Sequence, residues 1–157
     1  MCDYSLYTIP NRLADEGEEL VLHRFATGTL GFASVSDLAQ QEIQTKNQPA
    51  GFWPTVKAFF APRRCASLPA VCIAPGARLL LTEVPKTVQN TLCMGCPELV
   101  VFTELSNRSY SYRDALEFPN GTRVLLQDLP EGIHATVLST VPEFSVEPVP
   151  AEVYVRR

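Results

Sequence analysis

The stretch DALEFPNGTRVLLQDLPEGIHATVL, residues 114–138, constrains the fold of this chain more than any other part of it. Its centre holds Asn120-Gly121, the dipeptide that accepts a positive φ at both central positions of a type I′ turn. Apolar residues of strand-forming types stand on both sides of that dipeptide. The stretch therefore predicts a β-hairpin between a strand over 114–118 and a strand over 122–127.

A two-residue turn also sets the register of the hairpin. Phe118 is expected to pair with Arg123, and Leu116 with Leu125. The segment LPEG that comes next is typical of a type I turn, with proline at the second position and glycine at the fourth. It returns the chain into a strand over 133–138. We therefore predict a three-stranded antiparallel meander.

Further strands are indicated by short apolar runs between turn residues. Val124, Leu125 and Leu126 run consecutively, so the middle strand of the meander is expected to be covered on both faces. Pro75-Gly76 marks the turn of a second hairpin. The predicted fold class is mainly β, a β-barrel or sandwich of short antiparallel strands with one or two short helices. The other predicted strands cover 18–25, 70–74, 78–84 and 99–105.

We expect a single domain over 1–157 with one insertion and one tail. The segment 35–64 is interpreted as a helical and aromatic insertion, in which Ser36 is a candidate N-cap of a surface helix. The segment 142–157 alternates proline with apolar residues, which is typical of an extended C-terminal tail or edge strand.

Charge and hydropathy argue against two classes of partner. The formal net charge is −4 and the sequence pI is about 5.2, so the chain lacks the basic surface that nucleic-acid binding requires. Its apolar runs are strand-length, well below the roughly 18 residues of a membrane span. The first residues also lack the basic start and apolar run of a secretory signal. We therefore expect a cytoplasmic protein with no nucleic-acid and no membrane partner.

The chain has five cysteines, which in a reducing compartment are expected to be free thiols, metal ligands or redox groups. Cys93 and Cys96, in the segment CMGC, have the spacing of a metal knuckle. A zinc or iron site would need further ligands from Cys65, Cys72 or Cys2. The first two of these are spaced more widely than a usual knuckle. Our main expectation is no cofactor, and zinc stays open as the alternative.

The cysteines also have interpretations without a metal. Cys72 and Cys93 would equally be buried small hydrophobic residues, with CMGC as a plain turn. A redox pair is less favoured, because a strand rather than a helix follows Cys96. Cys2, freed by removal of the initiator methionine, is a candidate nucleophile of an N-terminal hydrolase, although a chain this poor in helix fits that class badly.

General acid–base catalysis would fall to His23 or His134, the two histidines of the chain. Neither stands near a Cys or Ser motif in the sequence, so each is expected at the surface or at the edge of the core. An enzyme is therefore the less favoured interpretation.

The segment QPAGFWPTVKAFFAPRR carries the candidate binding residues Trp53, Phe59 and Phe60. The safer interpretation is that these rings pack over one end of the sheet, because large rings are mostly buried. An exposed face would instead bind a ligand, with Tyr110 or Tyr112 nearby. We predict a small β-rich binding or interaction domain for an unknown small molecule or protein. A homodimer through an exposed edge strand stays open.

Three segments, MCDYSL, VCIAPGARL and DALEFPNGTRVLLQDLPEGIHATVL, resemble a group of small uncharacterised bacterial proteins. The resemblance covers the minor part of the chain, and the last segment is its most specific part. It implies a bacterial, cytoplasmic, single-domain protein and no particular activity. Members of the group commonly have His where Arg113 stands here, and they lack the Phe52–Phe60 segment and the Cys93/Cys96 pair.

Overall fold

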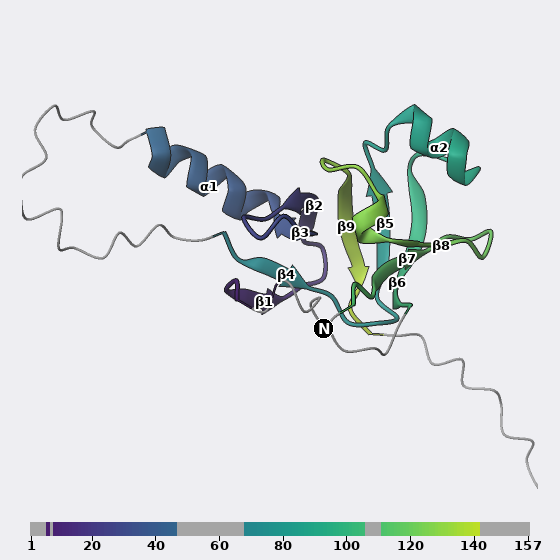
Figure 1. Cartoon of the computed structure of the whole chain (residues 1–157), viewed down its shortest axis with the longest axis horizontal. Coiled ribbons are helices and arrows are strands. Elements are labelled where there is room, and N and C mark those ends of the chain that lie inside the picture. Colours follow the sequence, from purple (N-terminus) through teal and green to yellow (C-terminus); the bar gives the residue numbers. More distant parts are fainter. Residues whose placement is uncertain (1–5, 7, 47–67, 106–110, 142–157) are drawn as a thin grey trace, which may run out of the picture.

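Nine short strands form one sheet in the computed structural model, which describes residues 6, 8–46, 68–105 and 111–141 (Figure 1). The strands run in the order β1-β4-β3-β2-β9-β5-β6-β7-β8, and every neighbouring pair is antiparallel except β1 and β4. Two α-helices and the 3₁₀-helix η3 accompany them. The bounds are β1 Asn11–Leu13, β2 Glu19–Arg24, β3 Leu30–Ser34, α1 Val35–Lys46, β4 Ala70–Cys72, β5 Arg78–Thr82, α2 Lys86–Leu92, β6 Glu98–Glu104, β7 Asp114–Glu117, β8 Arg123–Leu125, η3 Leu126–Asp128 and β9 His134–Ser139.

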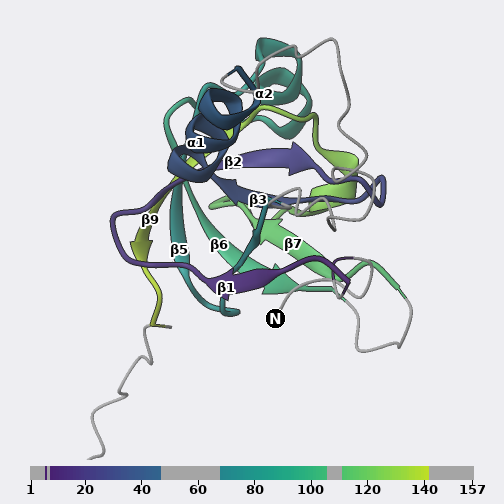
Figure 2. The same cartoon turned by 90° about the vertical axis from the view of Figure 1, so that its left-hand side faces the viewer.

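The predicted fold class is confirmed in its main point, because the described chain is mainly β. The sheet is nevertheless open rather than closed into a barrel, and β1 and β8 are its two edges. Figure 2 shows β2 and β3 crossing in front of β5, β6 and β7. The sheet therefore curls, so that the inner faces of its two halves meet around the larger of two clusters of buried hydrophobic residues.

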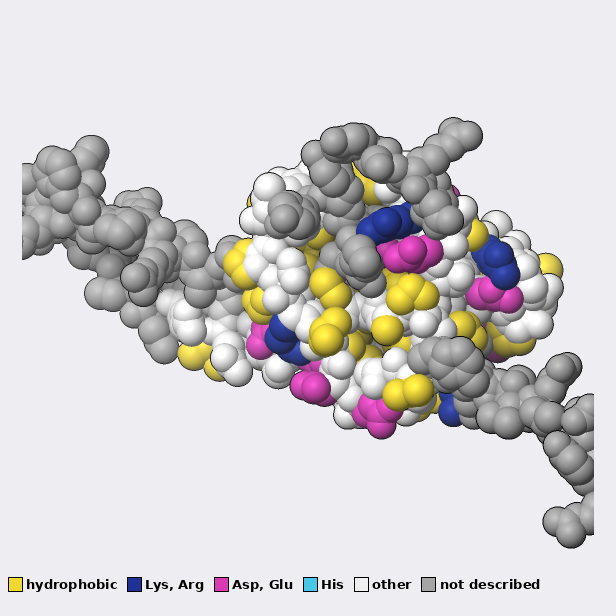
Figure 3. Space-filling view, turned by 90° about the horizontal axis from the view of Figure 1, so that it is seen from below, with side chains coloured by type: hydrophobic (Ala, Val, Ile, Leu, Met, Phe, Trp, Pro, Cys, Tyr) yellow, Lys and Arg dark blue, Asp and Glu magenta, His cyan; other side chains and the backbone are white. Residues whose placement is uncertain are grey.

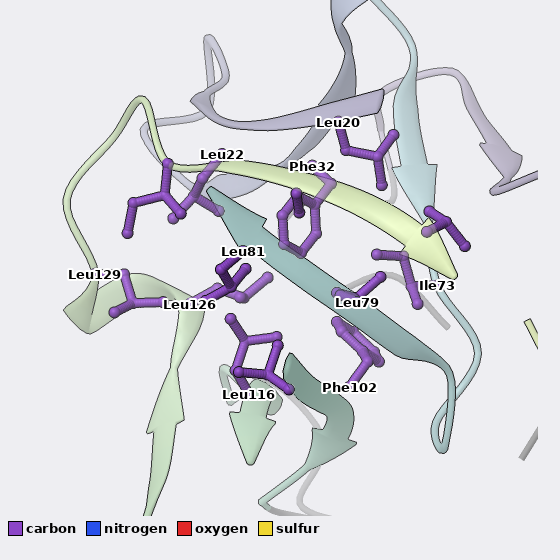
Figure 4. Packing of buried hydrophobic residues seen from close by; sticks show 14 of the residues in the cluster. Leu20, Leu22, Phe32, Ile73, Leu79, Leu81, Phe102, Leu116, Leu126 and Leu129 are labelled. Carbon is purple, nitrogen blue, oxygen red and sulfur yellow. The ribbon is translucent and has the colours of Figure 1, made fainter. Parts of the chain in front are cut away.

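Alternate residues of the strands point into this core. Leu79 and Leu81 of β5 are buried, whereas Leu80 between them is partly exposed. Figure 4 shows Phe32 of β3 and Phe102 of β6 directed into the same space as Leu79. Burial of this apolar surface is the main source of stability for such a sheet, at roughly 25 cal/mol per Å² removed from water.

The hairpin between β7 and β8 forms, but its predicted register is wrong by one residue. Leu116 pairs with Val124 rather than with the residue after it. Pro119 provides the physical reason, because its ring restricts φ to the value that the second position of a type I turn needs. Gly121 then takes a positive φ of 79°, and its N–H donates to Phe118 O at 2.8 Å. A type I turn followed by a left-handed glycine makes a three-residue loop instead of a two-residue one.

The predicted meander is wrong, because β9 lies between β2 and β5 and not beside β8. After β8 the chain turns through η3 and crosses to the other half of the sheet. There Gly132 N–H donates to Leu22 O, and Leu22 N–H donates to Ile133 O, both at 2.8 Å. These backbone bonds start the pairing of β9 with β2.

The predicted second hairpin is also wrong, although its turn exists. Gly76 has a φ of 93°, and Ala77 N–H donates to Ala74 O at 3.1 Å, as expected of a turn with Pro75 at its second position. The strands on either side of this turn do not pair: β4 lies between β1 and β3, whereas β5 lies between β9 and β6. The turn therefore carries the chain from one half of the sheet to the other.

The strands β1 and β3 and the helix α2 lie outside the elements predicted from the sequence. β3 has the sequence LGFAS, and all five of its residues are buried. Its glycine is required by close packing, since a Cβ on Gly31 would lie 2.6 Å from Leu6 Cδ1 and 3.3 Å from Phe25 Cε2. A glycine inside a strand marks such a close approach, whereas in the sequence it suggests a loop.

The helix α1 fills the first part of the predicted insertion and is a surface helix, as predicted. Ile43 on this helix is 59% exposed. The helix begins at Val35, so Ser34 rather than Ser36 precedes its first turn. The rest of the insertion, 47–64, and the predicted tail, 142–157, lie outside the described residues. Within the described ranges, none of the helices combines the length and the apolar character that crossing a bilayer requires.

The side chain of Gln127 connects η3 to β3 and so joins the two halves of the open sheet. Its Nε2 donates to Leu30 O at 2.8 Å, and its Oε1 accepts from Leu30 N at 3.0 Å. Leu30 is the first residue of β3 and is buried. The amide thereby satisfies both backbone groups of a buried residue, which a pairing strand would otherwise do.

A cluster of three charged side chains holds the edge strand β1. Arg12 of β1 forms a two-pronged ion pair with Glu18, which precedes β2, and contacts Asp37 Oδ2 of α1 at 3.2 Å. The guanidinium of Arg12 holds the pKa of the Glu18 carboxyl below its ordinary value of 4.5, against the opposing effect of burial. The Glu18 side chain is 13% exposed and that of Arg12 is 35% exposed, so solvent screens the pair in part.

The variant Glu18→Gln is therefore expected to be less stable than the wild type at neutral pH, by about 0.5 to 1 kcal/mol. The pKa of Glu18 is lower in the folded chain than in the unfolded chain. The contribution of its carboxylate is thus complete above the unfolded value and is lost as the pH falls through the folded value. Urea denaturation of both proteins across the acid range should show the difference shrinking to zero, and a difference that does not change with pH would contradict this account.

Candidate functional site

A pocket of about 240 Å³ opens between α2 and the segment around η3. Its walls come from one helix and from a strand and turn far along the chain. The lining residues are Thr87, Val88, Thr91, Leu92, Val124, Asp128 and Leu129. Concave, mainly apolar pockets with a few polar groups are the usual form of a small-molecule site, so this pocket is the candidate binding site.

The helix α2 forms one wall because two of its side chains face the core. Val88 and Leu92, four residues apart, lie on the same side of the helix and pack against the hydrophobic cluster. Gln89 Nε2 donates to Val84 O at 2.6 Å at the start of the helix. Asn120 Nδ2, from the β7–β8 hairpin, donates to Leu92 O at 2.9 Å at its end. The first bond joins α2 to the connection from β5, and the second joins it to the turn between β7 and β8, so both ends of the wall are held.

The polar groups of the pocket differ in how far they are engaged. Thr91 Oγ1 donates to Thr87 O at 2.8 Å, so this hydroxyl is turned onto the helix backbone. Asp128 is exposed and forms no hydrogen bond or ion pair with any other described residue. The pocket thus combines apolar walls, with buried Leu129 among them, and one carboxylate that has no protein partner in the described chain.

Cys93 and Cys96 are free and exposed, at the turn directly after α2. The interpretation of Cys93 as a buried small hydrophobic residue is therefore wrong. It ends the helix in the left-handed conformation, with φ 51° and ψ 47°. Among the residues that the structure describes, no group of three or more His, Cys, Asp or Glu side chains is placed to hold a metal ion.

Cys72 is buried, as expected, but it is also disulfide-bonded. In this form Cys72 offers no thiolate to a metal, which differs from the expectation that the cysteines are free thiols, metal ligands or redox groups. Cys2 and Cys65, the other candidate ligands, lie outside the described residues.

The aromatic candidates Trp53, Phe59 and Phe60 also lie outside the described residues, and so does Tyr110. Tyr112 is described and is 48% exposed. It is not among the residues that line the pocket. A ligand site built on these rings therefore stays a prediction.

The two histidines each face a glutamate at the surface. His23 Nδ1 lies 3.5 Å from Glu131 Oε1, and the His23 ring packs edge-on against Phe25 with the ring centroids 5.2 Å apart. His134 Nε2 lies 3.6 Å from Glu83 Oε2. Neither histidine lines the pocket. Their partly exposed positions agree with the expectation of surface or core-edge residues.

The pocket itself was not predictable as a site from the sequence, although one of its walls has a signal. Pro85 stands directly before α2, where the missing N–H of proline breaks no helical hydrogen bond. Together with Val88 and Leu92 at helical spacing, it would indicate a short amphipathic helix. No local pattern indicates that this helix meets the segment around η3.

Comparison of the chain with protein-family models, with curated proteins and with solved structures finds no match. The function of the chain is therefore inferred from its fold and its pocket.

Proposed function

We propose that this protein is a small binding domain that takes a largely apolar small molecule in the pocket between α2 and η3. The observation that carries the proposal is the pocket itself, because apolar side chains there meet water in a concave space next to a carboxylate that has no partner among the described residues. Concave apolar surface with a polar anchor is what gives a small ligand both affinity and orientation.

The size and lining of the pocket indicate the kind of ligand. A volume of about 240 Å³ is smaller than the roughly 300 to 1,000 Å³ of sites for drug-sized ligands, so the ligand is a compact one. Val88, Leu92 and Leu129 would contact its apolar body. Asp128 would accept a hydrogen bond from a hydroxyl or amine group at its other end.

The charges on the face drawn in Figure 3 favour a small-molecule ligand over nucleic acid. Figure 3 shows dark-blue basic side chains next to magenta acidic ones rather than gathered into a patch of their own. The distances agree: Arg123 Nε lies 2.7 Å from Glu117 Oε2, and Arg113 Nε lies 3.9 Å from Glu104 Oε1. Paired arginines are not available for the row of phosphate contacts on which nucleic-acid affinity depends.

Binding of the neutral fluorescent probe N-phenyl-1-naphthylamine tests the proposal. The wild type is expected to enhance its emission with saturation at one site, and to show shifts of the methyl signals of Val88, Leu92 and Leu129 in NMR spectra. Thr91→Phe places a ring in the pocket and is expected to weaken binding at least about tenfold, or roughly 1.4 kcal/mol.

The matched control is Asn90→Phe, which adds the same ring to the same helix at an exposed position that does not line the pocket. It is expected to bind the probe like the wild type. Equal binding by both variants would show that the probe binds elsewhere. No saturable binding by the wild type would contradict the proposed function.

A cytoplasmic location stays a prediction from the sequence. The disulfide of Cys72 is the one observation that bears on it, because structural disulfides are rare in reducing compartments. Counting thiols in the protein from cells, with alkylation before and after reduction, would show whether this bond is formed there.

A further inference from the structure

Cys93 and Cys96 stand on one exposed turn outside the pocket, and both thiols are free. Backbone hydrogen bonds fix the end of α2, which directly precedes this turn. The N–H groups of Cys93 and Met94 both donate to Gln89 O, the second at 3.0 Å, so they close the last turn of α2. The pair therefore begins at a defined position at the end of a helix.

The chain within the turn is held as well. Gly95 N–H donates to Glu98 Oε2 at 2.6 Å, and Met94 packs against the hydrophobic core. With Met94 directed inward, the two cysteines that flank this segment remain exposed. Cys93 Sγ contacts Asn90 O at 3.9 Å, a weak interaction that a change of rotamer releases. The turn thus presents two thiols on a backbone that needs little ordering to bind a ligand.

The number of available ligands decides which ion the turn suits. Zinc in a structural site takes four ligands, and the described residues supply no group of three. Thiolates are soft ligands that suit Cu(I), zinc and iron–sulfur clusters. Of these, Cu(I) is the ion that two sulfurs in a near-linear arrangement satisfy. From these observations we infer that Cys93 and Cys96 together bind one Cu(I) ion.

The reach of the two side chains is sufficient for one ion. Three peptide units hold the two Cα atoms within about 11 Å of each other. Two metal–sulfur bonds of about 2.3 Å each, added to two cysteine side chains, span a distance of that order. On binding, each thiol releases its proton to water and both sulfurs bond to the metal as thiolates, so the complex of one Cu(I) carries a net charge of −1.

The test is an anaerobic titration of the purified full-length protein with Cu(I), in competition with the coloured chelator bathocuproine disulfonate. The wild type is expected to withhold one Cu(I) per chain, and X-ray absorption should show sulfur as the metal's only close neighbours. Cys93→Ser and Cys96→Ser should each weaken binding at least hundredfold, because a single thiolate competes poorly with the chelator. Both positions are exposed, so circular dichroism should report an unchanged fold.

The matched control is Met94→Leu, which removes the third sulfur of the turn and keeps an apolar side chain against the core. It is expected to bind Cu(I) like the wild type. Three results would overturn the inference: a hundredfold loss in Met94→Leu, retention of the ion by the Cys93→Ser/Cys96→Ser double variant, or displacement of Cu(I) by an equal concentration of Zn(II). The loss in Met94→Leu would mean that a thioether is also a ligand. Retention by the double variant would mean that other cysteines hold the ion, and displacement by Zn(II) would indicate a different set of ligands.

Discussion

Replacing Phe102 with alanine is expected to lower the free energy of unfolding by about 3 to 5 kcal/mol. Phe102 is 1% exposed and is the largest of the fully buried side chains in the described core. Figure 4 shows its ring close to Leu79 in the cluster of buried side chains. Its removal therefore leaves a cavity inside this cluster, which close-packed neighbours do not fill completely.

Urea denaturation followed by far-UV circular dichroism measures this effect, and the thermal midpoint should fall by roughly 10 °C. Leu99→Ala on the same strand is the matched control, because Leu99 points away from the core and is 42% exposed. It is expected to change the stability by less than about 1 kcal/mol. Equal losses in the two variants would mean that the inner and outer faces of β6 are assigned wrongly.

The local signals in the sequence predict which segments are strands better than they predict which strands pair. The apolar run over 79–81 and the glycine turn at Gly76 describe the chain within a few residues, and the structure has a strand and a turn there. Pairing depends on the register of segments that are distant in sequence. β9 and β2, for example, are joined by bonds between Leu22 and Gly132, which no window around either residue contains.

The slipped hairpin register shows how one neglected residue changes a prediction. Asn120-Gly121 by itself favours a two-residue turn, but the ring of Pro119 fixes φ at a value that favours the type I geometry. Gly121 is then the only residue of this turn with a positive φ. Leu116 consequently faces Val124. The proline and the dipeptide taken together predict the correct loop.

The candidate site was less predictable than the fold because its parts are held together by single side chains. The CMGC segment is visible in the sequence, and its exposure follows from the inward packing of Met94, which a sequence does not show. The pocket requires α2 to lie against the segment around η3. That arrangement depends on bonds such as Asn120 Nδ2 to Leu92 O, whose partners are far apart in the chain.

Replacing Gln127 with alanine is expected to lower the free energy of unfolding by about 2 to 6 kcal/mol, because it leaves two buried backbone groups without a partner. Leu30 N–H and Leu30 C=O both bond to the Gln127 amide, and Leu30 is 1% exposed. Water cannot easily replace the amide at such a residue, so each group loses its partner at a cost of about 1 to 3 kcal/mol. The thermal midpoint and the protection of the Leu30 amide against hydrogen exchange should both fall.

Gln127→Glu separates the roles of the two bonds. At neutral pH its carboxylate can accept from Leu30 N–H but cannot donate to Leu30 C=O. The free energy of unfolding of this variant should therefore lie between that of the wild type and that of the alanine variant. On acidification the carboxyl group becomes a donor, and the gap to the wild type should narrow. Gln40→Ala, on the exposed surface of α1, should leave stability unchanged within about 0.5 kcal/mol. If Gln127→Ala behaved like Gln40→Ala, the link between η3 and β3 would contribute nothing to stability, and the curled sheet would be held by its core alone.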